Sequence, residues 1–570
     1  MKARSRNFAS RSALIFIVLF IAASPCLPQA QSRTAVPAMS ITVSMERPTT
    51  HYYHVVFRVD GLKGETQDFK MPAWTPGYYR IMDYAKNIKD FKAEDGANRP
   101  LAWEKTAKNT WRVRSGKAAS IVVSYDVYAF TRFVADSYLG DDGGFITPTA
   151  LFMNVAGRLK DPVALTVLPH PDWKSVSTGL DPVAGRPNMF SAPDFDTLYD
   201  CPILIGNQEV LTFEAAGRPH TVAAYDLGTA DRTKFTGDLK KIVEAAAALM
   251  GELPYRHYTF LIIGPGGGGL EHLNSTAVTL NPASLTNPQA AKGWLSFIAH
   301  EYFHLFNVKA IRPIALGPFD YERENYTNML WVSEGITVYY EFILLNRAGL
   351  MTRDEVLERL GSTIANYENA PGRHHHQPAT ASSFDTWTNF FSRGEHTANT
   401  TISYYDIGAG LGLLLDLRIR EASKGRSSLD DVMRTLYRTY YQEKKRGFAG
   451  LTIDTEPGTA PGPWFGAATQ DQNGSPVVSS VELDSPASLA GLSAQDEIVA
   501  IDGARVTQRS LAGTINSRKP GDKVKVLYAR RGAVHETEVT LGKKTERSFR
   551  ITPLANPTPG QKALLNGWLK

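Results

Sequence analysis

Alternating hydrophobic and polar residues dominate the first third of the 570-residue chain. Residues 53–59 and 120–127 alternate in this way or are rich in β-branched side chains, and turn-forming residues separate such runs. This pattern predicts an antiparallel β-domain over residues 38–206. A helical period follows over residues 234–250, and a strand pattern follows that period over residues 258–263.

The middle of the chain carries three further helical patterns. Apolar residues dominate residues 294–306, a second apolar stripe runs over residues 329–345, and a third runs over residues 407–422. We therefore predict a mainly α-helical domain over residues 207–455.

Short strands and turns return near the C-terminus. They follow a stretch rich in Pro and Gly at residues 456–463, which is typical of a linker. The pattern predicts a small β-domain over residues 463–545, so the whole chain is expected to be a multidomain α+β protein.

Residues 1–30 have the composition of a secretory signal peptide. Four basic residues precede an apolar run at residues 13–23, and Ala30 offers a small residue for cleavage. The apolar run is about half of the roughly 20 residues that span a bilayer, so we expect no permanent membrane anchor. The sequence predicts an exported bacterial protein, either periplasmic or secreted.

Charge and cysteine content exclude two classes of protein. The net charge of +5 includes the four basic residues of the predicted signal peptide, which leaves 5 − 4 = +1 for the remainder. A nearly neutral chain gives no indication of nucleic-acid binding. Of the two cysteines, Cys26 lies in the predicted signal peptide and Cys201 stands alone, which excludes a disulfide framework.

The motif His-Glu-x-x-His at residues 300–304 is the strongest chemical signal in the chain. His300 and His304 are four residues apart, so on a helix they lie on one face and can bind one metal ion. Glu301 lies beside them, where its carboxylate can accept a proton from an attacking water. Glu334, in the next helical pattern, is the best candidate for a third ligand. Two histidines and one glutamate make an open zinc site.

Four consecutive glycines, ending at Gly269, follow the strand pattern of residues 258–263. No Gly-Lys-Ser/Thr sequence or long helix follows them directly, so the segment is not a phosphate-binding loop. Glycines allow another backbone to approach closely, as a peptide lying along a sheet edge would require.

Together these motifs resemble the M61 family of glycyl aminopeptidases, relatives of the M1 aminopeptidases. The resemblance rests on His300-Glu-Tyr-Phe-His304, the Asn-Val-Lys that ends at Lys309, Trp331-Val-Ser-Glu-Gly335 and Met71-Pro-Ala-Trp-Thr-Pro-Gly77. Residues 485–492 and 496–503 are similar to bacterial PDZ domains. The resemblance covers nearly the whole chain after residue 30. It implies a thermolysin-like, mainly α catalytic domain between the N-terminal β-domain and a PDZ-like β domain.

The resemblance also implies roles for individual residues. One Zn²⁺ per chain would be held by His300, His304 and Glu334, with Glu301 as the general base. Tyr405 matches the tyrosine that stabilises the tetrahedral intermediate in M1 enzymes, and Tyr404 is the competing choice. The segment Gly268-Gly269-Leu-Glu271-His272 resembles the substrate-binding loop, in which Glu271 would hold the free amine of the substrate.

The function expected from these roles is a zinc aminopeptidase that uses a metal-activated water to remove small N-terminal residues, Gly or Ala, from peptides. Two alternatives remain open: an exported zinc endopeptidase, and a non-catalytic protein that binds peptides through its PDZ domain. Glu301 favours an enzyme, because a structural metal site does not need a base. The expected partners are peptide substrates, and peptide or protein C-termini at the PDZ-like domain.

Overall fold

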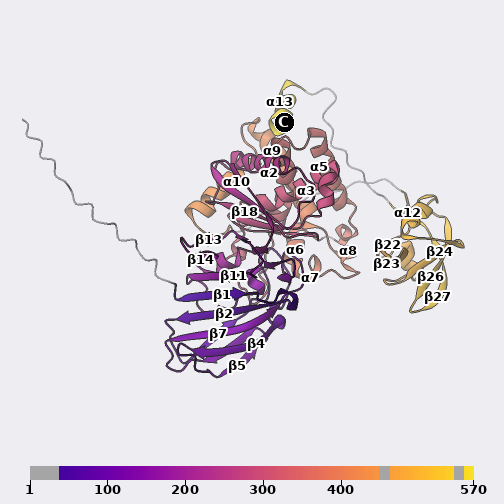
Figure 1. Cartoon of the computed structure of the whole chain (residues 1–570). Helices are drawn as coiled ribbons and strands as arrows, with labels where there is room; N and C mark the ends of the chain where they lie inside the picture. Colours follow the sequence, from indigo (N-terminus) through magenta and orange to yellow (C-terminus); the bar gives the residue numbers. More distant parts are fainter. Residues whose placement is uncertain (1–36, 376, 449–461, 545–557, 570) are drawn as a thin grey trace, which may run out of the picture. The chain divides into compact units, whose positions relative to one another are not determined.

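Strands and helices follow one another in the predicted order, with a β-rich part first, a largely helical part next and a β-rich part last. The computed structural model describes residues 37–375, 377–448, 462–544 and 558–569 (Figure 1). The predicted signal peptide, residues 1–30, lies outside the described residues, as do the predicted domain ends at residues 455 and 545.

Within residues 39–192, a seven-stranded sheet has the order β13-β14-β11-β1-β2-β7-β4. Its strands are β1 (Met39–Ser44), β2 (Tyr52–Asp60), β4 (Ile88–Asp95), β7 (Ser120–Tyr128), β11 (Val163–Leu168), β13 (Asp181–Pro182) and β14 (Met189–Ala192). Because side chains alternate between the faces of a strand, β2 buries Tyr53, Val55 and Phe57 on one face. Neighbouring strands are antiparallel, as predicted, except that β1 and β11 are parallel.

Two four-stranded sheets and a short helix complete the N-terminal β-domain within residues 66–206. One sheet contains β3 (Thr66–Lys70), β5 (Trp103–Ala107), β6 (Thr110–Arg114) and β10 (Asn154–Val155). The other contains β8 (Tyr138–Gly140), β9 (Gly143–Ile146), β12 (Ser175–Thr178) and β15 (Ile203–Gly206). Helix α1 (Phe195–Tyr199) follows β14, and Phe57, Phe69 and Phe195 pack into the core of this domain.

The second domain begins with a mixed sheet, of which the sequence predicted one strand. Within residues 209–278 the strand order is β16-β17-β18-β20-β19. The strands are β16 (Glu209–Ala215), β17 (Arg218–Ala224), β18 (Tyr258–Ile262), β19 (Gly269–Glu271) and β20 (Ser275–Val278). Helix α2 (Arg232–Met250) connects the parallel strands β17 and β18. The glycine-rich segment therefore leads into β19, which is an edge strand of this sheet.

Helices form the remainder of the second domain. The first, α3 (Pro288–Phe303), begins after Asn287, whose side chain accepts hydrogen bonds from two backbone N–H groups of the first turn. The predicted helix of residues 329–345 starts with a π-helical turn (Trp331–Gly335) and continues as α4 (Ile336–Arg347). The other helices are α5 (Arg353–Glu368), α6 (Ala379–Phe384), α7 (Thr386–Asn389), α8 (Thr397–Thr400), α9 (Tyr404–Ser423), α10 (Leu429–Leu436) and a π-helical segment (Tyr437–Glu443).

The third, PDZ-like domain is built mainly of strands within residues 462–544. Its main strands have the order β22-β23-β24-β26-β27, so that β22 lies at an edge. These elements are β22 (Ala467–Gln472), β23 (Ser475–Val481), β24 (Glu497–Ile501), β26 (Lys523–Arg530) and β27 (Ala533–Thr540). The smaller ones are β21 (Gly462–Trp464), α11 (Pro486–Leu489), β25 (Ala504–Arg505), α12 (Gln508–Asn516) and β28 (Gly542–Lys544). No helix among the described residues is both long enough and apolar enough to span a membrane.

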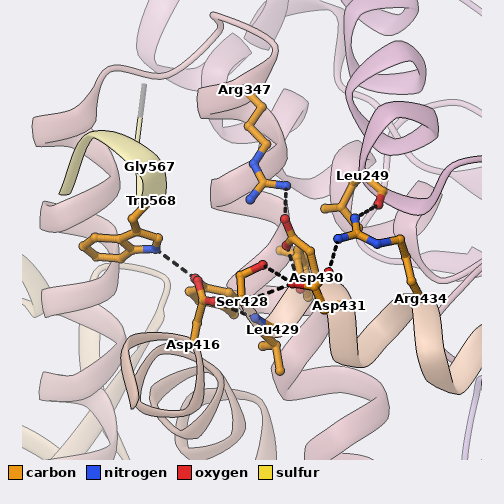
Figure 2. Close-up of polar contacts among 12 residues, drawn as sticks. Leu249, Arg347, Asp416, Ser428, Leu429, Asp430, Asp431, Arg434, Gly567 and Trp568 are labelled. Atoms are coloured by element: carbon orange, nitrogen blue, oxygen red, sulfur yellow. Dashed lines mark hydrogen bonds and ion pairs between the residues drawn. The ribbon is translucent and has the colours of Figure 1, made fainter. Parts of the chain in front are cut away.

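After the PDZ-like domain the chain returns to the helices of the second domain as α13 (Pro559–Trp568), which the sequence did not predict. The indole Nε1 of Trp568 donates to the hydroxyl of Tyr339 at 2.9 Å, and that hydroxyl donates to Asp416 at 2.6 Å. Arg420 donates to the carbonyl of Gly567 at 3.1 Å. Figure 2 shows Trp568 and Asp416 together with the polar contacts of the neighbouring helix α10. The C-terminal segment is thus part of the packing of α4 and α9.

Candidate active site

Three buried side chains form a group that can hold a metal ion. Helix α3 carries His300, and His304 is the residue that directly follows its last residue and is still in the right-handed helical conformation. The π-helical turn carries Glu334. The Nε2 atom of His304 lies 3.1 Å from Glu334 Oε2, and the Nε2 atom of His300 lies 3.6 Å from the same oxygen. These three were the predicted ligands, and their donor atoms all lie within 4.8 Å of one another.

The hydrogen bonds behind the histidines show that this group suits a cation. The Nδ1 atom of His304 lies 2.8 Å from the carbonyl oxygen of Asn307, which can only accept, so Nδ1 carries the proton. The Nδ1 atom of His300 donates to Glu341 at 3.0 Å. In the neutral rings each Nε2 then presents a lone pair, and the two Nε2 atoms face each other at 2.9 Å beside a carboxylate. Lone pairs and a carboxylate that converge in this way repel one another unless a proton or a metal ion lies between them, and three such donors are a ligand set suited to a metal ion.

The charges in this group are strongly coupled. Burial alone would raise the pKa of Glu334, but the two histidines outweigh burial and lower the pKa to about 2. Burial alone would likewise lower the pKa of His300, yet hydrogen bonds to Glu334 and Glu341 raise it well above its ordinary value. The site therefore favours positive charge at its centre.

Glu301 lies beside the metal group on α3 and faces the glycine-rich segment. A Cβ atom on Gly269 would lie 2.4 Å from the carboxyl carbon of Glu301, so a larger residue at position 269 would collide with this side chain. Among the described residues, no hydrogen bond or ion pair holds the Glu301 carboxylate. Burial raises the pKa of Glu301 to about 7, which is the range suited to a general base at neutral pH.

Glu271, at the end of edge strand β19, has a buried carboxylate that points to the same cavity. A Cβ atom on Gly77 would lie within 2.9 Å of both of its carboxylate oxygens, and the φ angle of Gly77 is +95°. Gly77 belongs to the Met71–Gly77 segment of the β-domain, so the N-terminal domain forms part of the cavity wall beside Glu271. Gly268 and Gly269 line the cavity as predicted.

His272 does not line this cavity, so the predicted substrate contact for His272 does not fit the structure. Its Nδ1 atom instead lies 3.0 Å from Asp200 of the β-domain, and the ring faces a separate cavity of about 620 Å³. The physical reason is the alternation of side chains along an extended segment, which turns residues 271 and 272 to opposite sides.

The first turn of α9 separates the two candidate tyrosines. The ring of Tyr405 lies 6.2 Å from the ring of His300, centroid to centroid, and lines the active-site cavity. Tyr404 is fully buried, and its hydroxyl lies 2.9 Å from the hydroxyl of Thr386. The structure thus places Tyr405, rather than Tyr404, beside the metal group.

The cavity that joins these residues has a volume of about 620 Å³ and is walled by aromatic rings near Glu271. The ring of Tyr78 lies 5.0 Å from that of Phe133 and 4.9 Å from that of Phe391. The aromatic residues of the segment 71–80, which include Tyr78, were candidates for a pocket wall from the sequence, but Phe133 and Phe391 were not, because they come from segments far apart in the chain. The sequence analysis also missed Glu341, although Glu334 and Glu341 are the two charged residues in the apolar run of residues 329–345.

Comparison with known proteins places these features in a family. A family model of the peptidase M61 N-terminal domain matches residues 40–207, the M61 glycyl aminopeptidase model matches residues 293–411, and a PDZ domain model matches residues 463–541. The search of the curated proteins found no match.

Solved structures include a similar protein, an aminopeptidase N family protein from Idiomarina loihiensis. It is 29% identical, with a TM-score of 0.83 over 93% of this chain and 100% of that chain. Yeast LTA4 hydrolase matches with a lower TM-score of 0.44 and 14% identity, over 73% of this chain and 63% of that chain. The M1 zinc metallopeptidase from Deinococcus radiodurans matches with a TM-score of 0.42 and 13% identity, over 71% of this chain and 86% of that chain. With its His-His-Glu metal group inside the matched peptidase segment, the chain belongs to the M61 family of glycyl aminopeptidases.

Proposed function

We propose that this protein is a zinc aminopeptidase that removes one small residue, Gly or Ala, from the free N-terminus of a peptide. The observation that carries the proposal is the carboxylate of Glu271. Its residue is 5% exposed, and no hydrogen bond or ion pair joins the carboxylate to another of the described residues. A buried carboxylate without a direct hydrogen-bond or ion-pair partner is costly, so this carboxylate favours a cationic group of the ligand. The ammonium group of a peptide N-terminus supplies that charge.

The residues around Glu271 then have defined tasks. His300, His304 and Glu334 would hold a zinc ion, which would supply a Lewis acid for polarising a carbonyl and activating water. Glu301 accepts the proton of the attacking water and transfers it to the leaving amine. The hydroxyl of Tyr405 donates a hydrogen bond to the negative charge that develops on the carbonyl oxygen, a type of contact worth roughly 3 kcal/mol.

Two features of the cavity support removal of a single small residue. The edge of β19 offers backbone groups to an extended peptide, and Gly268 and Gly269 allow its backbone to come close. Beyond Glu271, Gly77 and the ring of Tyr78 leave little room for chain that would precede the cleaved residue. This closed end favours an aminopeptidase over an endopeptidase.

Residues 1–30 and the PDZ-like domain add a cellular location and a second peptide-binding site to the proposal. Residues 1–30 support export to the periplasm or the medium. In the PDZ-like domain, the edge strand β22 lies at the end of its sheet, where a peptide or protein C-terminus can add as a further strand.

The proposal is tested with the purified protein on Gly, Ala and Leu anilides, each with a free and an N-acetylated amine, before and after treatment with a chelator. We expect cleavage of the free Gly and Ala substrates, loss of activity with the metal, and recovery with Zn²⁺. Acetylation removes the ammonium charge and should lower kcat/KM by about two orders of magnitude or more. Cleavage of acetylated peptides as fast as free ones would show an endopeptidase.

Three variants assign the roles. Glu271→Ala should lose most of the discrimination between free and acetylated substrates, while the exposed Glu214→Ala serves as a control with wild-type behaviour. Glu301→Gln should keep zinc while turnover falls by about 10² or more. Glu334→Ala should release zinc, because it removes one of three protein ligands. Full zinc occupancy and activity in Glu334→Ala would refute the ligand assignment.

A further inference from the structure

Asp200, at the end of helix α1 in the β-domain, accepts hydrogen bonds from two segments of the catalytic domain. Lys309 Nζ donates to its Oδ1 atom at 2.7 Å, and His272 Nδ1 donates to the same oxygen at 3.0 Å. The backbone N–H of Leu273 donates to the other oxygen, Oδ2, at 2.9 Å. One carboxylate therefore satisfies donors from two separate parts of the catalytic domain.

These two segments carry the two halves of the proposed site. The backbone N–H of Lys309 donates to the carbonyl of His304 at 3.0 Å, so Lys309 is fixed directly to a metal ligand. His272 follows Glu271, which is proposed to hold the substrate amine. The contacts of Asp200 thus connect the end of the metal-binding helix to the strand that presents Glu271.

The charges at this junction are buried and mutually dependent. Burial would raise the pKa of Asp200, but Lys309 and His272 outweigh burial and hold the pKa well below its usual range. The ammonium group of Lys309 is largely buried against this carboxylate, 2.7 Å from Asp200 Oδ1. Lys309 and Asp200 therefore form a largely buried ion pair, in which each charge depends on the other.

Of the two ring nitrogens of His272, only Nδ1 has a hydrogen-bond partner among the described residues, and that partner is Asp200. His272 is 3% exposed, and its Nε2 atom is a buried polar atom without a hydrogen-bond partner among the described residues. Leaving a buried polar atom unpaired costs free energy, and an apolar side chain would avoid that cost. Compared with an apolar side chain, a histidine at this position gains the hydrogen bond from Nδ1 to Asp200.

We propose that Asp200, acting through Lys309 and His272, is a positioning residue that fixes Glu271 at a set place relative to the metal group and thereby determines recognition of the substrate amine. This inference rests on the proposed aminopeptidase function. Asp200 faces the cavity behind β19 and does not line the active-site cavity, so it acts on the substrate through Glu271.

The test compares Asp200→Asn with Asp196→Asn in the full chain. Asp196 lies on the same helix and lines the same rear cavity, but it accepts from Tyr321 and Lys160 and forms no hydrogen bond with His272. For Asp200→Asn we expect KM for free Ala anilide to rise about tenfold, the loss of roughly one charged hydrogen bond. We expect kcat and zinc content to stay near wild type, and the free-to-acetylated ratio of kcat/KM to fall about tenfold. Asp196→Asn should leave KM and that ratio unchanged.

A second pair of variants keeps the test informative if Asp200→Asn does not fold. His272→Asn retains a donor toward Asp200, whereas His272→Leu has none, so His272→Leu should show the rise in KM and His272→Asn should largely restore the wild-type value. Unchanged KM and unchanged amine discrimination in both Asp200→Asn and His272→Leu, with only a lower Tm, would overturn the inference. If the wild-type enzyme does not discriminate between free and acetylated amines, the proposed function itself fails, and that result is separate from the behaviour of the variants.

Discussion

Gly335 and Gly408 bring the segments that carry Glu334 and Tyr405 into backbone contact. A Cβ atom on Gly335 would lie 2.4 Å from the Cα atom of Gly408. Gly335 directly follows Glu334, and Gly408 lies within one turn of Tyr405 on α9. The absence of two side chains therefore sets the distance between a metal ligand and the proposed oxyanion donor.

Replacing Gly408 by Ala should separate these two segments. The new Cβ atom would lie 2.2 Å from the carbonyl oxygen of Trp331, so α9 must move and Tyr405 must move with it. We expect the free energy of unfolding to fall by about 1–3 kcal/mol, the usual cost of overpacking, and kcat to fall by at least about tenfold. Gly410→Ala is the matched control, because no atom lies within 4 Å of a Cβ at position 410. Equal effects of the two substitutions in denaturation and kinetic assays would contradict this explanation.

Glu341 should control the affinity of the metal site without binding the metal. It accepts from His300 Nδ1 at 3.0 Å and from Ser296 Oγ at 2.9 Å, and so holds the His300 ring in one orientation. Loss of such an outer contact typically weakens metal binding or activity by about 10- to 100-fold. We expect Glu341→Ala to raise the zinc dissociation constant by that factor in a competition assay with a chelator. The exposed Glu358→Ala should bind zinc as the wild type does, and unchanged affinity in Glu341→Ala would mean that His300 needs no such support.

Tyr405 and Tyr404 offer neighbouring substitutions with opposite expected results. Tyr405→Phe should lower kcat far more than it raises KM, because the hydroxyl acts mainly in the transition state. Tyr404→Phe should keep kcat and lower the free energy of unfolding by about 1 kcal/mol, because it removes the buried hydrogen bond to Thr386. Steady-state kinetics and urea denaturation of both variants distinguish the two roles. A loss of kcat confined to Tyr404→Phe would reverse the assignment.

His220 should make the fold sensitive to mild acid. It is buried in β17, its Nδ1 donates to the carbonyl of Arg218 at 2.9 Å, and its Nε2 accepts from the hydroxyl of Tyr255 at 2.8 Å. Burial lowers the pKa of His220 to about 4. Between about pH 6.5, where an unfolded histidine titrates, and about pH 4, the unfolded chain binds a proton that the folded chain does not. The contribution of the neutral, buried His220 to the free energy of unfolding is fully present above about pH 6.5, and it decreases as the pH falls towards about 4.

We expect the free energy of unfolding to decrease by roughly 1–3 kcal/mol across this window because of His220 alone. Urea denaturation at several pH values, for the wild type and His220→Gln, measures the difference. The variant should be less stable at pH 7.5 but should lose less stability on acidification. Parallel curves for the two proteins would show that His220 does not titrate in this way.

Local patterns were sufficient to predict the part of the site that lies on one helix. His300, Glu301 and His304 fall within one turn, so helical geometry alone brings them together. Glu334 could be predicted because it lies in the next apolar helical pattern, although the π-helical turn that carries it could not. That turn packs against α9 through Gly335 and Gly408, a contact between distant segments that local sequence does not encode.

Contacts between distant segments account for what the sequence did not reveal. Gly77 meets Glu271 only because the β-domain packs against the glycine-rich segment, and Asp200 meets Lys309 for the same reason. Most strands of the mixed sheet were also missed, since the short β19 and β20 lack a long apolar run and are defined by pairing with each other and with β18. Predicting such pairs requires knowledge of which domain surfaces meet.

The packing of α13 against α4 and α9 affects the order in which the parts of the chain can fold during synthesis. Residues 559–569 are synthesised after the PDZ-like domain, yet the indole of Trp568 is the donor to the buried hydroxyl of Tyr339. During synthesis, N-terminal segments generally fold first. The β-domain can therefore form early, whereas the helices that carry Glu334 and Tyr405 reach their final packing only when the last segment has been made. We therefore expect the packing around the metal group to be completed only after the PDZ-like domain has been synthesised.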